Sequence, residues 1–266
     1  MMELLLSTAP RWALVHAPAL LVMVPLFLAP ILTLLPSGRI AWLLSIAATV
    51  ASLLCALILL VQVQTSPTGV VGYDVGNWPM PIGIVLRVDA LNAMILLLVS
   101  AIGVLASIFS WPTVVAEVRE AKHSLFYSAF LVCFAGLLGV AITGDAFNMF
   151  VFLEISSIST YVLVGMGASN DRRALTAAYN YLVLGTIGAT FFVIGVGFLY
   201  MATGTLNMAD MATRLPELSD SRVVQAAFAF IIVGLGLKAA MFPLHLWLPN
   251  AYAYAPNFVT VFLATT

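Results

Sequence analysis

Two ionisable residues occupy the middle of long apolar segments of this sequence. Glu154 lies in "AFNMFVFLEISSISTYVLVGM", and Lys238 lies near the midpoint of the apolar segment at residues 223–250. A charge at the centre of a membrane helix costs on the order of 3 kcal/mol on insertion scales, so such residues are rare and usually functional. A carboxylate and an amine are also groups that accept and release protons. The two positions therefore predict proton-transfer chemistry.

Neither residue has a counter-charge at helical spacing on its own segment. The residues three and four positions away from each are apolar or small, apart from Ser157. Glu154 is the only acid deep in an apolar segment, so we expect it to pair with Lys238 across the bundle, with coupled protonation. The alternative is that the pair only fastens two helices. Interhelical polar contacts are worth only about 0.6 kcal/mol on average, which is small compared with the free-energy cost of placing two charges inside the membrane.

A proline close to Lys238 predicts a broken helix. Pro243 cannot donate the hydrogen bond that would reach the carbonyl of Ala239. Carbonyls freed inside a membrane need polar partners or water, so a break usually lines a cavity. Gly234 and Gly236 permit close helix approach before the lysine. Burial disfavours the charged form of a lysine and a nearby carboxylate favours it, so Lys238 is placed to accept and release a proton.

Other polar residues are weaker candidates. His245 either extends a proton path as a relay or sits at the membrane interface beside an aromatic residue, and the sequence leaves both open. Asp145 is predicted to be a helix N-cap. Asn180 and Tyr181 are candidates for lining a wet path. His16 is predicted to be a packed or interfacial histidine. Four hydroxyl residues follow Glu154 on the same segment and either order water or, more commonly, close helix–helix contacts: Ser156, Ser157, Ser159 and Thr160.

Composition identifies the class of protein that carries these residues. The chain has 266 residues, of which 63% are hydrophobic and only 8% are charged. Soluble domains average about 25% charged residues, so this chain is predicted to be an all-α polytopic membrane protein. Runs of roughly 20 apolar residues can each cross a bilayer. We expect seven crossings, at residues 13–35, 40–63, 89–111, 124–143, 146–166, 174–203 and 223–250, and a partial eighth that starts near Pro256 and is cut off at Thr266.

The segments between the crossings predict an orientation. Residues 65–87 read as a short extramembrane hairpin, and residues 206–222 read as an amphipathic connection. Counting Lys and Arg by alternate loops places Arg39, Arg119, Lys122, Arg172 and Arg173 together. By the positive-inside rule these loops face the cytoplasm and the N-terminus lies outside.

Several classes of function have no support in the sequence. The net charge of −1 gives no basic patch for nucleic acid. Cys55 and Cys133 lie in separate apolar runs and read as packing residues, and the three histidines lack metal-ligand spacing. No cofactor motif and no cleavable signal peptide are recognised, so we expect no cofactor and no metal, and a transporter subunit rather than an enzyme.

Three stretches together resemble a known family. "FVFLEISSISTYVLVGM", "AAYNYLVLGTIGATFFVIGVGFLYMATGTLNMADMA" and "GLGLKAAMFPLHLWLPNAYAYAP" are similar to the antiporter-like membrane subunits of multisubunit Mrp-type Na⁺/H⁺ antiporters and of complex I. "GNWPMPIGIVLRVDALNAM" adds support. "YMATGTLNMADMA" and "LHLWLPNAYAYAP" favour the D subunit of the Mrp system.

The resemblance implies an inverted-repeat bundle of about fourteen helices, whose midplane residues include a glutamate matching Glu154 and a lysine on a broken helix matching Lys238. By this reading, residues 1–123 form an N-terminal three-helix region and residues 124–266 form the first five-helix repeat, incomplete at its end. The lysine or histidine of the family's eighth helix would follow Thr266, and the second repeat is absent.

Three functions remain open from the sequence. The first is a proton-translocating subunit of a Na⁺/H⁺ antiporter in the cell (inner) membrane, working with other membrane subunits. The second is a non-redox, proton-pumping subunit of an NADH–quinone oxidoreductase or related hydrogenase complex. The third is a truncated scaffold that does not conduct. Co-purifying chains and vesicle flux distinguish them.

Overall fold

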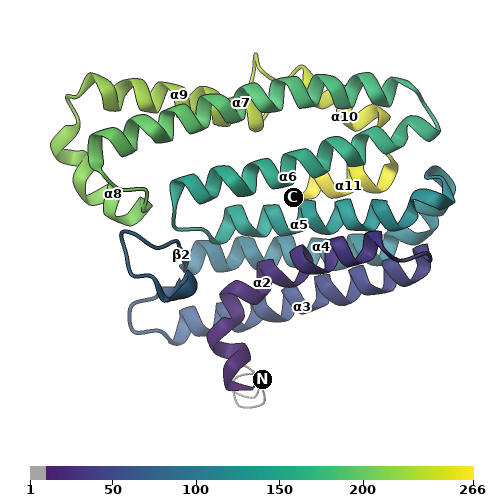
Figure 1. Cartoon of the computed structure of the whole chain (residues 1–266), viewed down its shortest axis with the longest axis horizontal. Coiled ribbons are helices and arrows are strands. Elements are labelled where there is room, and N and C mark those ends of the chain that lie inside the picture. Colours follow the sequence, from purple (N-terminus) through teal and green to yellow (C-terminus); the bar gives the residue numbers. More distant parts are fainter. Residues whose placement is uncertain (1–9) are drawn as a thin grey trace.

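The computed structural model describes residues 10–266, and the described chain is mostly helical (Figure 1). Six helices or helical segments are long and apolar enough to cross a membrane. The long helices are α2 (Arg11–Thr33), α3 (Gly38–Thr65), α4 (Ala90–Glu117), α5 (His123–Ile142), α6 (Ala146–Gly165) and α7 (Arg173–Thr203). These six match the first six predicted crossings, and the chain is a multi-pass membrane protein.

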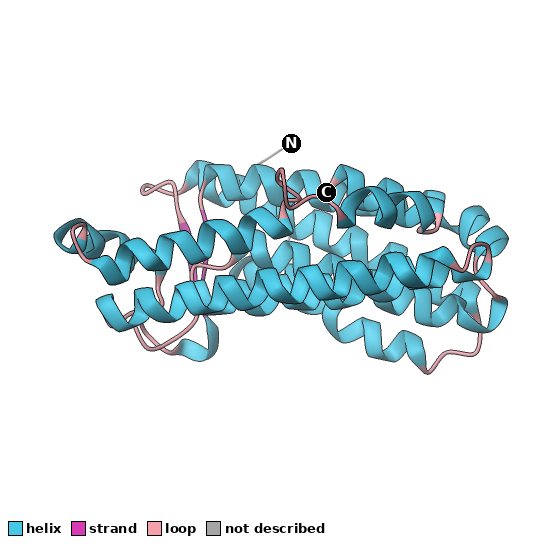
Figure 2. Cartoon of the chain, turned by 90° about the horizontal axis from the view of Figure 1, so that it is seen from above, coloured by secondary structure: helices cyan, strands magenta, loops and turns pink. Residues whose placement is uncertain are grey.

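The seventh predicted crossing is not one continuous helix. Residues 223–250 divide into α9 (Arg222–Lys238) and α10 (Trp247–Tyr254), with non-helical backbone between them. The remaining helices are α8 (Met208–Arg214) and α11 (Asn257–Thr265), and the 3₁₀ turns are η1 (Val75–Asn77), η2 (Glu120–Lys122), η3 (Met166–Ser169) and η4 (Leu215–Leu218). Figures 1 and 2 show the long helices lying along a common axis, the arrangement expected of a membrane bundle.

Helix α5 forms the centre of the bundle because it is apolar on every side. It packs against α2, α3, α4 and α6, and a helix that is hydrophobic all round is stable only when buried. Phe130 contacts the rings of both Phe258 and Phe262 at 5.1 Å between centroids, so α11 is held on α5 by edge-on aromatic pairs. The same apolar core extends through α2 to α6, across residues 123 and 124. The predicted boundary between residues 123 and 124, which would be the start of the five-helix repeat, stays a prediction.

The predicted hairpin is present and closes one end of the bundle. Strands β1 (Val71–Asp74) and β2 (Val85–Val88) pair antiparallel, so pairing continues past the predicted limit at residue 87. Leu86 forms a bridge with Thr143, and Gly144 N–H donates to Val85 O at 2.8 Å. These bonds attach the hairpin to the junction between α5 and α6, because an unpaired strand edge at a membrane surface needs a partner.

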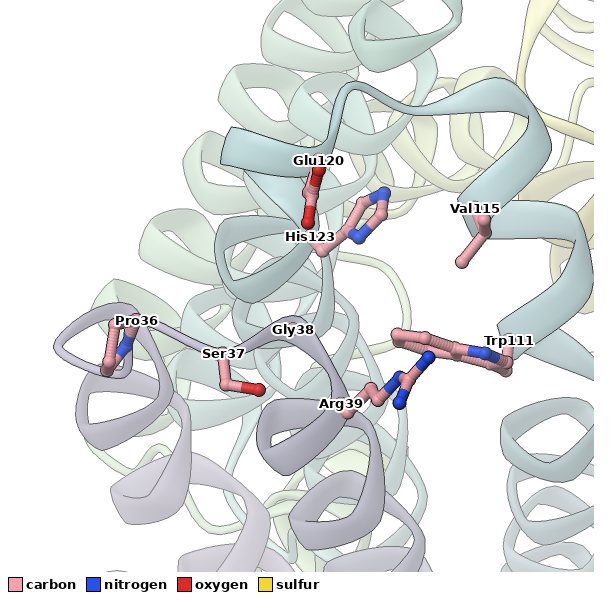
Figure 3. Close-up of a pocket in the computed structure, with 8 residues that line it drawn as sticks. All are labelled: Pro36, Ser37, Gly38, Arg39, Trp111, Val115, Glu120 and His123. Atoms are coloured by element: carbon pink, nitrogen blue, oxygen red, sulfur yellow. The ribbon is translucent and has the colours of Figure 1, made fainter.

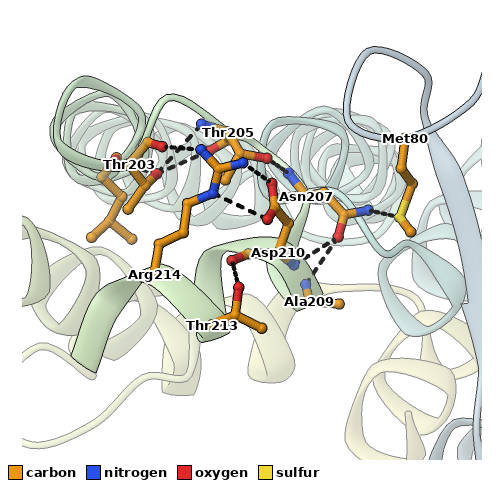
Figure 4. A network of polar contacts seen from close by, with 9 residues as sticks. Met80, Thr203, Thr205, Asn207, Ala209, Asp210, Thr213 and Arg214 are labelled. Carbon is orange, nitrogen blue, oxygen red and sulfur yellow. Dashed lines mark hydrogen bonds and ion pairs between the residues drawn. The ribbon is translucent and has the colours of Figure 1, made fainter. Parts of the chain in front are cut away.

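A polar network ties α8 to the same end (Figure 4). Arg214 donates to both carboxylate oxygens of Asp210, at 3.0 and 2.8 Å, and to the carbonyl of Thr203 at 2.9 Å. Asn207 caps α8 by accepting from two backbone N–H groups, and its amide donates to the sulfur of Met80 at 3.0 Å. The C-terminus of α7, the amphipathic connection and the hairpin loop are therefore joined by side-chain bonds rather than by packing alone.

The opposite end of the bundle carries the basic loops. Arg39 and Glu120 line one cavity there, and Asn257 donates to the carboxylate of Glu117. The Arg173 guanidinium lies 4.6 Å from the centroid of the Tyr254 ring. The basic loops that carry Arg39 and Arg173 therefore lie at the same end of the bundle. The side of the membrane that they face stays a prediction.

Candidate functional site

The structure places the two buried charges in contact. The Nζ of Lys238, the last residue of α9, donates to Oε1 of Glu154 on α6 at 2.9 Å. The Lys238 side chain is 11% exposed and that of Glu154 is 21% exposed. Breaking a buried pair by removing one partner typically costs about 3–5 kcal/mol. This ion pair therefore joins α6 to α9, although 84 residues separate its partners in the sequence.

Ser157 completes the surroundings of the ammonium group. Its hydroxyl donates to the carbonyl of Leu153 at 2.7 Å, one turn earlier in α6. The Nζ of Lys238 donates to the same Ser157 oxygen at 2.6 Å. Because the hydroxyl proton is directed at the backbone, a lone pair is left for the ammonium, and the lysine is oriented by two acceptors from one helix.

The helix that carries Lys238 ends at the lysine itself. Ala239 N–H bonds to Leu235 O at 2.7 Å, and Ala240 has a positive φ of 50°, a conformation that stops a right-handed helix. Pro243 lies three residues further on, in the non-helical segment, where it prevents the helix from restarting early. The predicted break therefore begins at Lys238, which lies at the end of α9 rather than in the middle of a kinked helix.

A cavity of about 220 Å³ adjoins the lysine. Its lining includes Lys238, Tyr181, Trp247 and Tyr252. The rings of Tyr181 and Trp247 stack at 4.0 Å with an interplanar angle of 5°. The indole N–H of Trp247 donates to the carbonyl of Leu237 at 2.9 Å, so one of the backbone acceptors freed at the break has a partner. Most of the lining is apolar, and among the described residues the Lys238 amine is its one charged group.

Of the weaker candidates, Tyr181 lies beside Lys238 and Asn180 does not. Asn180 lines a separate, more exposed cavity of about 370 Å³ between α7 and the break. His245 lies in the break, with its ring 5.6 Å from that of Phe242, and its buried Nδ1 has no hydrogen-bond partner in the described part of the chain. Within residues 10–266, no hydrogen bond joins His245 to Lys238, so its relay role stays a proposal.

The remaining polar candidates have structural partners. Asp145 caps α6 by accepting from Asn148 N–H at 2.7 Å, as predicted. His16, predicted to be a packed or interfacial histidine without a polar neighbour, has one, because its Nδ1 lies 3.0 Å from the hydroxyl of Tyr73 on β1. The other hydroxyls of α6, those of Ser156, Ser159 and Thr160, donate to carbonyls of their own helix.

Sequence reasoning missed two aromatic residues of this site. The pattern around Trp247 indicates only an aromatic residue at the membrane interface, and no pattern singles out Tyr161. Tyr161 packs edge-on against Tyr181 at 4.7 Å, and its buried hydroxyl has no partner in the described chain. Tyr161 lies seven residues after Glu154, two turns along the same face of α6, and that spacing is the signal that could have identified it.

Comparisons with known proteins show which family the chain resembles. Residues 143–266 match the family described as NADH:quinone oxidoreductase/Mrp antiporter, TM. The chain is 43% identical over 256 residues to the N subunit of the NADH-quinone oxidoreductase of Desulforudis audaxviator, covering 94% of this chain and 49% of that protein. It is 36% identical over 236 residues to the D subunit of the Na(+)/H(+) antiporter of Bacillus subtilis, covering 88% and 46%.

A solved structure shares the fold. The chain superposes on a chain of the Mrp complex from Dietzia with a TM-score of 0.80 and 26% identity, covering 93% of this chain and 46% of that one. The chain therefore spans about half the length of the curated relatives it matches.

Proposed function

We propose that this chain translocates protons as one membrane subunit of a multisubunit monovalent cation/proton antiporter. Its resemblance to the antiporter-like membrane subunits is confirmed. Na⁺ is the proposed coupling ion, the cell (inner) membrane the proposed location, and other membrane subunits the proposed partners. The observation that carries the proposal is the contact of 2.9 Å between Lys238 and Glu154, made at the end of a broken helix.

The proposed step is a proton exchange governed by the distance between the two charges. In contact, the carboxylate of Glu154 and the hydroxyl of Ser157 favour the ammonium form of Lys238. When the carboxylate moves away, the buried ammonium loses its compensation and releases a proton to the adjoining cavity. Cation movement elsewhere in the assembly would drive that separation, and no cofactor takes part.

Two conservative substitutions test the chemistry separately from the packing. Glu154→Gln keeps an oxygen that accepts from Lys238 but removes the negative charge. Lys238→Arg keeps the positive charge but cannot deprotonate in a protein. Each should lower proton flux in reconstituted vesicles by about 100-fold, the range of a lost proton-transfer group. Glu154→Gln should also melt at a lower temperature, because the ammonium loses its counter-charge, so flux is compared in variants that still fold. Lys122→Arg and Glu217→Gln, at exposed positions, are matched controls that should retain flux.

Two outcomes would refute the proposal. Parent-level flux in folded Lys238→Arg would show that deprotonation of the lysine is not required. Unchanged flux in Glu154→Gln and Lys238→Ala together would favour the non-conducting scaffold. His245→Phe, tested in the same vesicles, decides whether the histidine is a relay, since a structural ring would be replaced without loss of flux.

A second candidate function is favoured by one comparison. The identity of 43% to the N subunit of an NADH-quinone oxidoreductase exceeds the 36% to the D subunit of an antiporter. On that reading the same pair would pump protons in a redox-driven complex, with the redox chemistry in other chains. Purification of the native assembly decides between them. Co-purifying flavin and iron–sulfur subunits would support the redox complex, and small membrane subunits alone would support the antiporter.

A further inference from the structure

A polar cavity lies at the basic end of the bundle, away from the Lys238 site. It has a volume of about 500 Å³ and lies between the start of α3, the end of α4 and the turn η2. Figure 3 shows Glu120 and His123 on one side of the cavity and Arg39 with Trp111 on the other. The lining thus carries one positive and one negative charge on facing walls, which is the pattern that a zwitterionic ligand requires.

The Arg39 wall is built to receive a phosphate. Arg39 is the second residue of α3, a helix of 28 residues. The first backbone bond of this helix is Ala41 N–H to Ser37 O, and Ser37, the N-cap residue, makes no side-chain capping bond. The preceding N–H groups therefore lack acceptors in the described chain. N-terminal N–H groups of a long helix together with a guanidinium are a recurrent phosphate site.

The opposite wall offers acceptors to an ammonium group. His123 is 5% exposed, and its Nε2 lies 2.9 Å from the carbonyl of Val118. A carbonyl only accepts, so Nε2 carries a proton, and in the tautomer protonated at Nε2 alone Nδ1 is an acceptor. Nδ1 has no hydrogen-bond partner in residues 10–266, and it lies close to Gly38 at the start of α3. The Glu120 carboxylate adds a negative charge on the same side.

The cavity lies at the depth expected for a lipid headgroup. The Arg39 guanidinium is 5.8 Å from the centroid of the Trp111 ring, and Trp42 packs against Trp111 at 5.4 Å. Tryptophan and arginine anchor helix ends at the membrane interface. From the cavity, exposed apolar side chains continue along the two helices toward the membrane centre. Leu43 on α3 is 56% exposed and Ile108 on α4 is 55% exposed, which leaves a surface for acyl chains.

We propose that this cavity binds the headgroup of a phospholipid that carries both a phosphate and a primary ammonium, as phosphatidylethanolamine does. The phosphate binds Arg39 and the free N–H groups of α3, and the ammonium donates to Glu120 and to Nδ1 of His123. A choline headgroup has no N–H to donate, and a glycerol headgroup has no positive charge for the carboxylate. The site therefore selects phosphatidylethanolamine over both.

Native mass spectrometry of the purified chain tests the proposal with three probes, phosphatidylethanolamine, phosphatidylcholine and phosphatidylglycerol, each with the same acyl chains. The parent should retain phosphatidylethanolamine about tenfold more tightly than the other two, equivalent to about 1.4 kcal/mol. Glu120→Gln should remove the preference over phosphatidylcholine, and Arg39→Gln should weaken retention of all three. Arg119→Gln, an exposed arginine beside Glu120, is the matched control and should behave as the parent.

Three results would overturn the proposal. Equal retention of the three lipids by the parent would remove the selectivity, and a full preference in folded Glu120→Gln would remove the ammonium contact. Soluble O-phosphoethanolamine, which lacks acyl chains, should displace the lipid only at far higher concentration. Displacement at the lipid's own concentration would make the ligand a free phosphate ester rather than a membrane lipid.

Discussion

The close approach of α7 and α9 provides the sharpest test of how the fold positions Lys238. Gly234 lies on α9, one turn before the lysine, and faces the backbone of α7. A β-carbon at Gly234 would lie 2.7 Å from the carbonyl oxygen of Gly188 and 2.7 Å from the backbone nitrogen of Phe192. Both atoms belong to a helix backbone, so neither can move without moving α7.

The expected cost follows from these distances. Ordinary contact begins near 3.4 Å, so Gly234→Ala requires the two helices to separate by about 0.7 Å (3.4 minus 2.7). Overpacking of this kind costs about 1–3 kcal/mol. Gly236→Ala is the matched control, because its β-carbon would meet only side-chain atoms, Leu244 Cδ1 at 3.6 Å and Met241 Sδ at 3.9 Å. Both changes gain similar helix propensity, so Gly234→Ala should be the less stable of the two by about 1–3 kcal/mol.

Equilibrium unfolding in detergent or bicelles measures this difference, and vesicle flux measures its consequence. Separation of α9 from α7 displaces Lys238 relative to Glu154, so flux should fall in Gly234→Ala and persist in Gly236→Ala. If the two variants are equally stable, or if Gly236→Ala is the more damaging one, the helix approach does not position the lysine and the reasoning fails.

Three further predictions concern other contacts. Trp247→Phe removes the indole bond and leaves the Leu237 carbonyl with only the longer bond from Ala240 N–H at 3.3 Å, so it should cost about 0.5–1.5 kcal/mol in unfolding experiments; a variant as stable as the parent would contradict this. The Arg214 guanidinium, mainly through its hydrogen bonds, holds the pKa of the Asp210 carboxyl below its ordinary 3.8, so this stabilisation is present above pH 3.8 and is lost as pH falls through the lower folded-state pKa. NMR titration of Asp210 checks the sign, and a midpoint at or above 3.8 refutes it. Glu117→Gln weakens the carboxylate that caps α11, so amide exchange at residues 257–260 should accelerate about fivefold, for about 1 kcal/mol of lost capping, and unchanged exchange would show that the cap is dispensable.

The sequence predicted the crossings well because the bilayer sets their length. The six uninterrupted apolar runs match α2 to α7, within a few residues at most ends. The exact end of α9 was not predictable. Pro243 marks that a break exists, but the positive φ of Ala240, which ends the helix at Lys238, depends on the packing of the following turn.

The contact between Glu154 and Lys238 was predictable by elimination, because no other acid lies deep in an apolar run. The third partner, Ser157, was not assigned, since a serine on a membrane helix usually bonds to its own backbone. Ser157 does so as well, and accepts from the lysine with its remaining lone pair. The stack of Tyr181 on Trp247 joins residues of α7 and α10, and nothing in a single sequence sets that distance.

The division of α9 from α10 has a mechanical consequence. A continuous helix turns as a rigid rod, so rotation at one end carries every side chain with it. Here the regular helix ends at Lys238 and a new one begins at Trp247; turn-like backbone bonds such as Met241 N–H to Gly236 O fill the break, and the indole of Trp247 bonds the start of α10 to the end of α9. The orientation of Lys238 toward Glu154 is therefore set by α9, whereas α10 is positioned by its own packing on α7 through the stack of Trp247 on Tyr181.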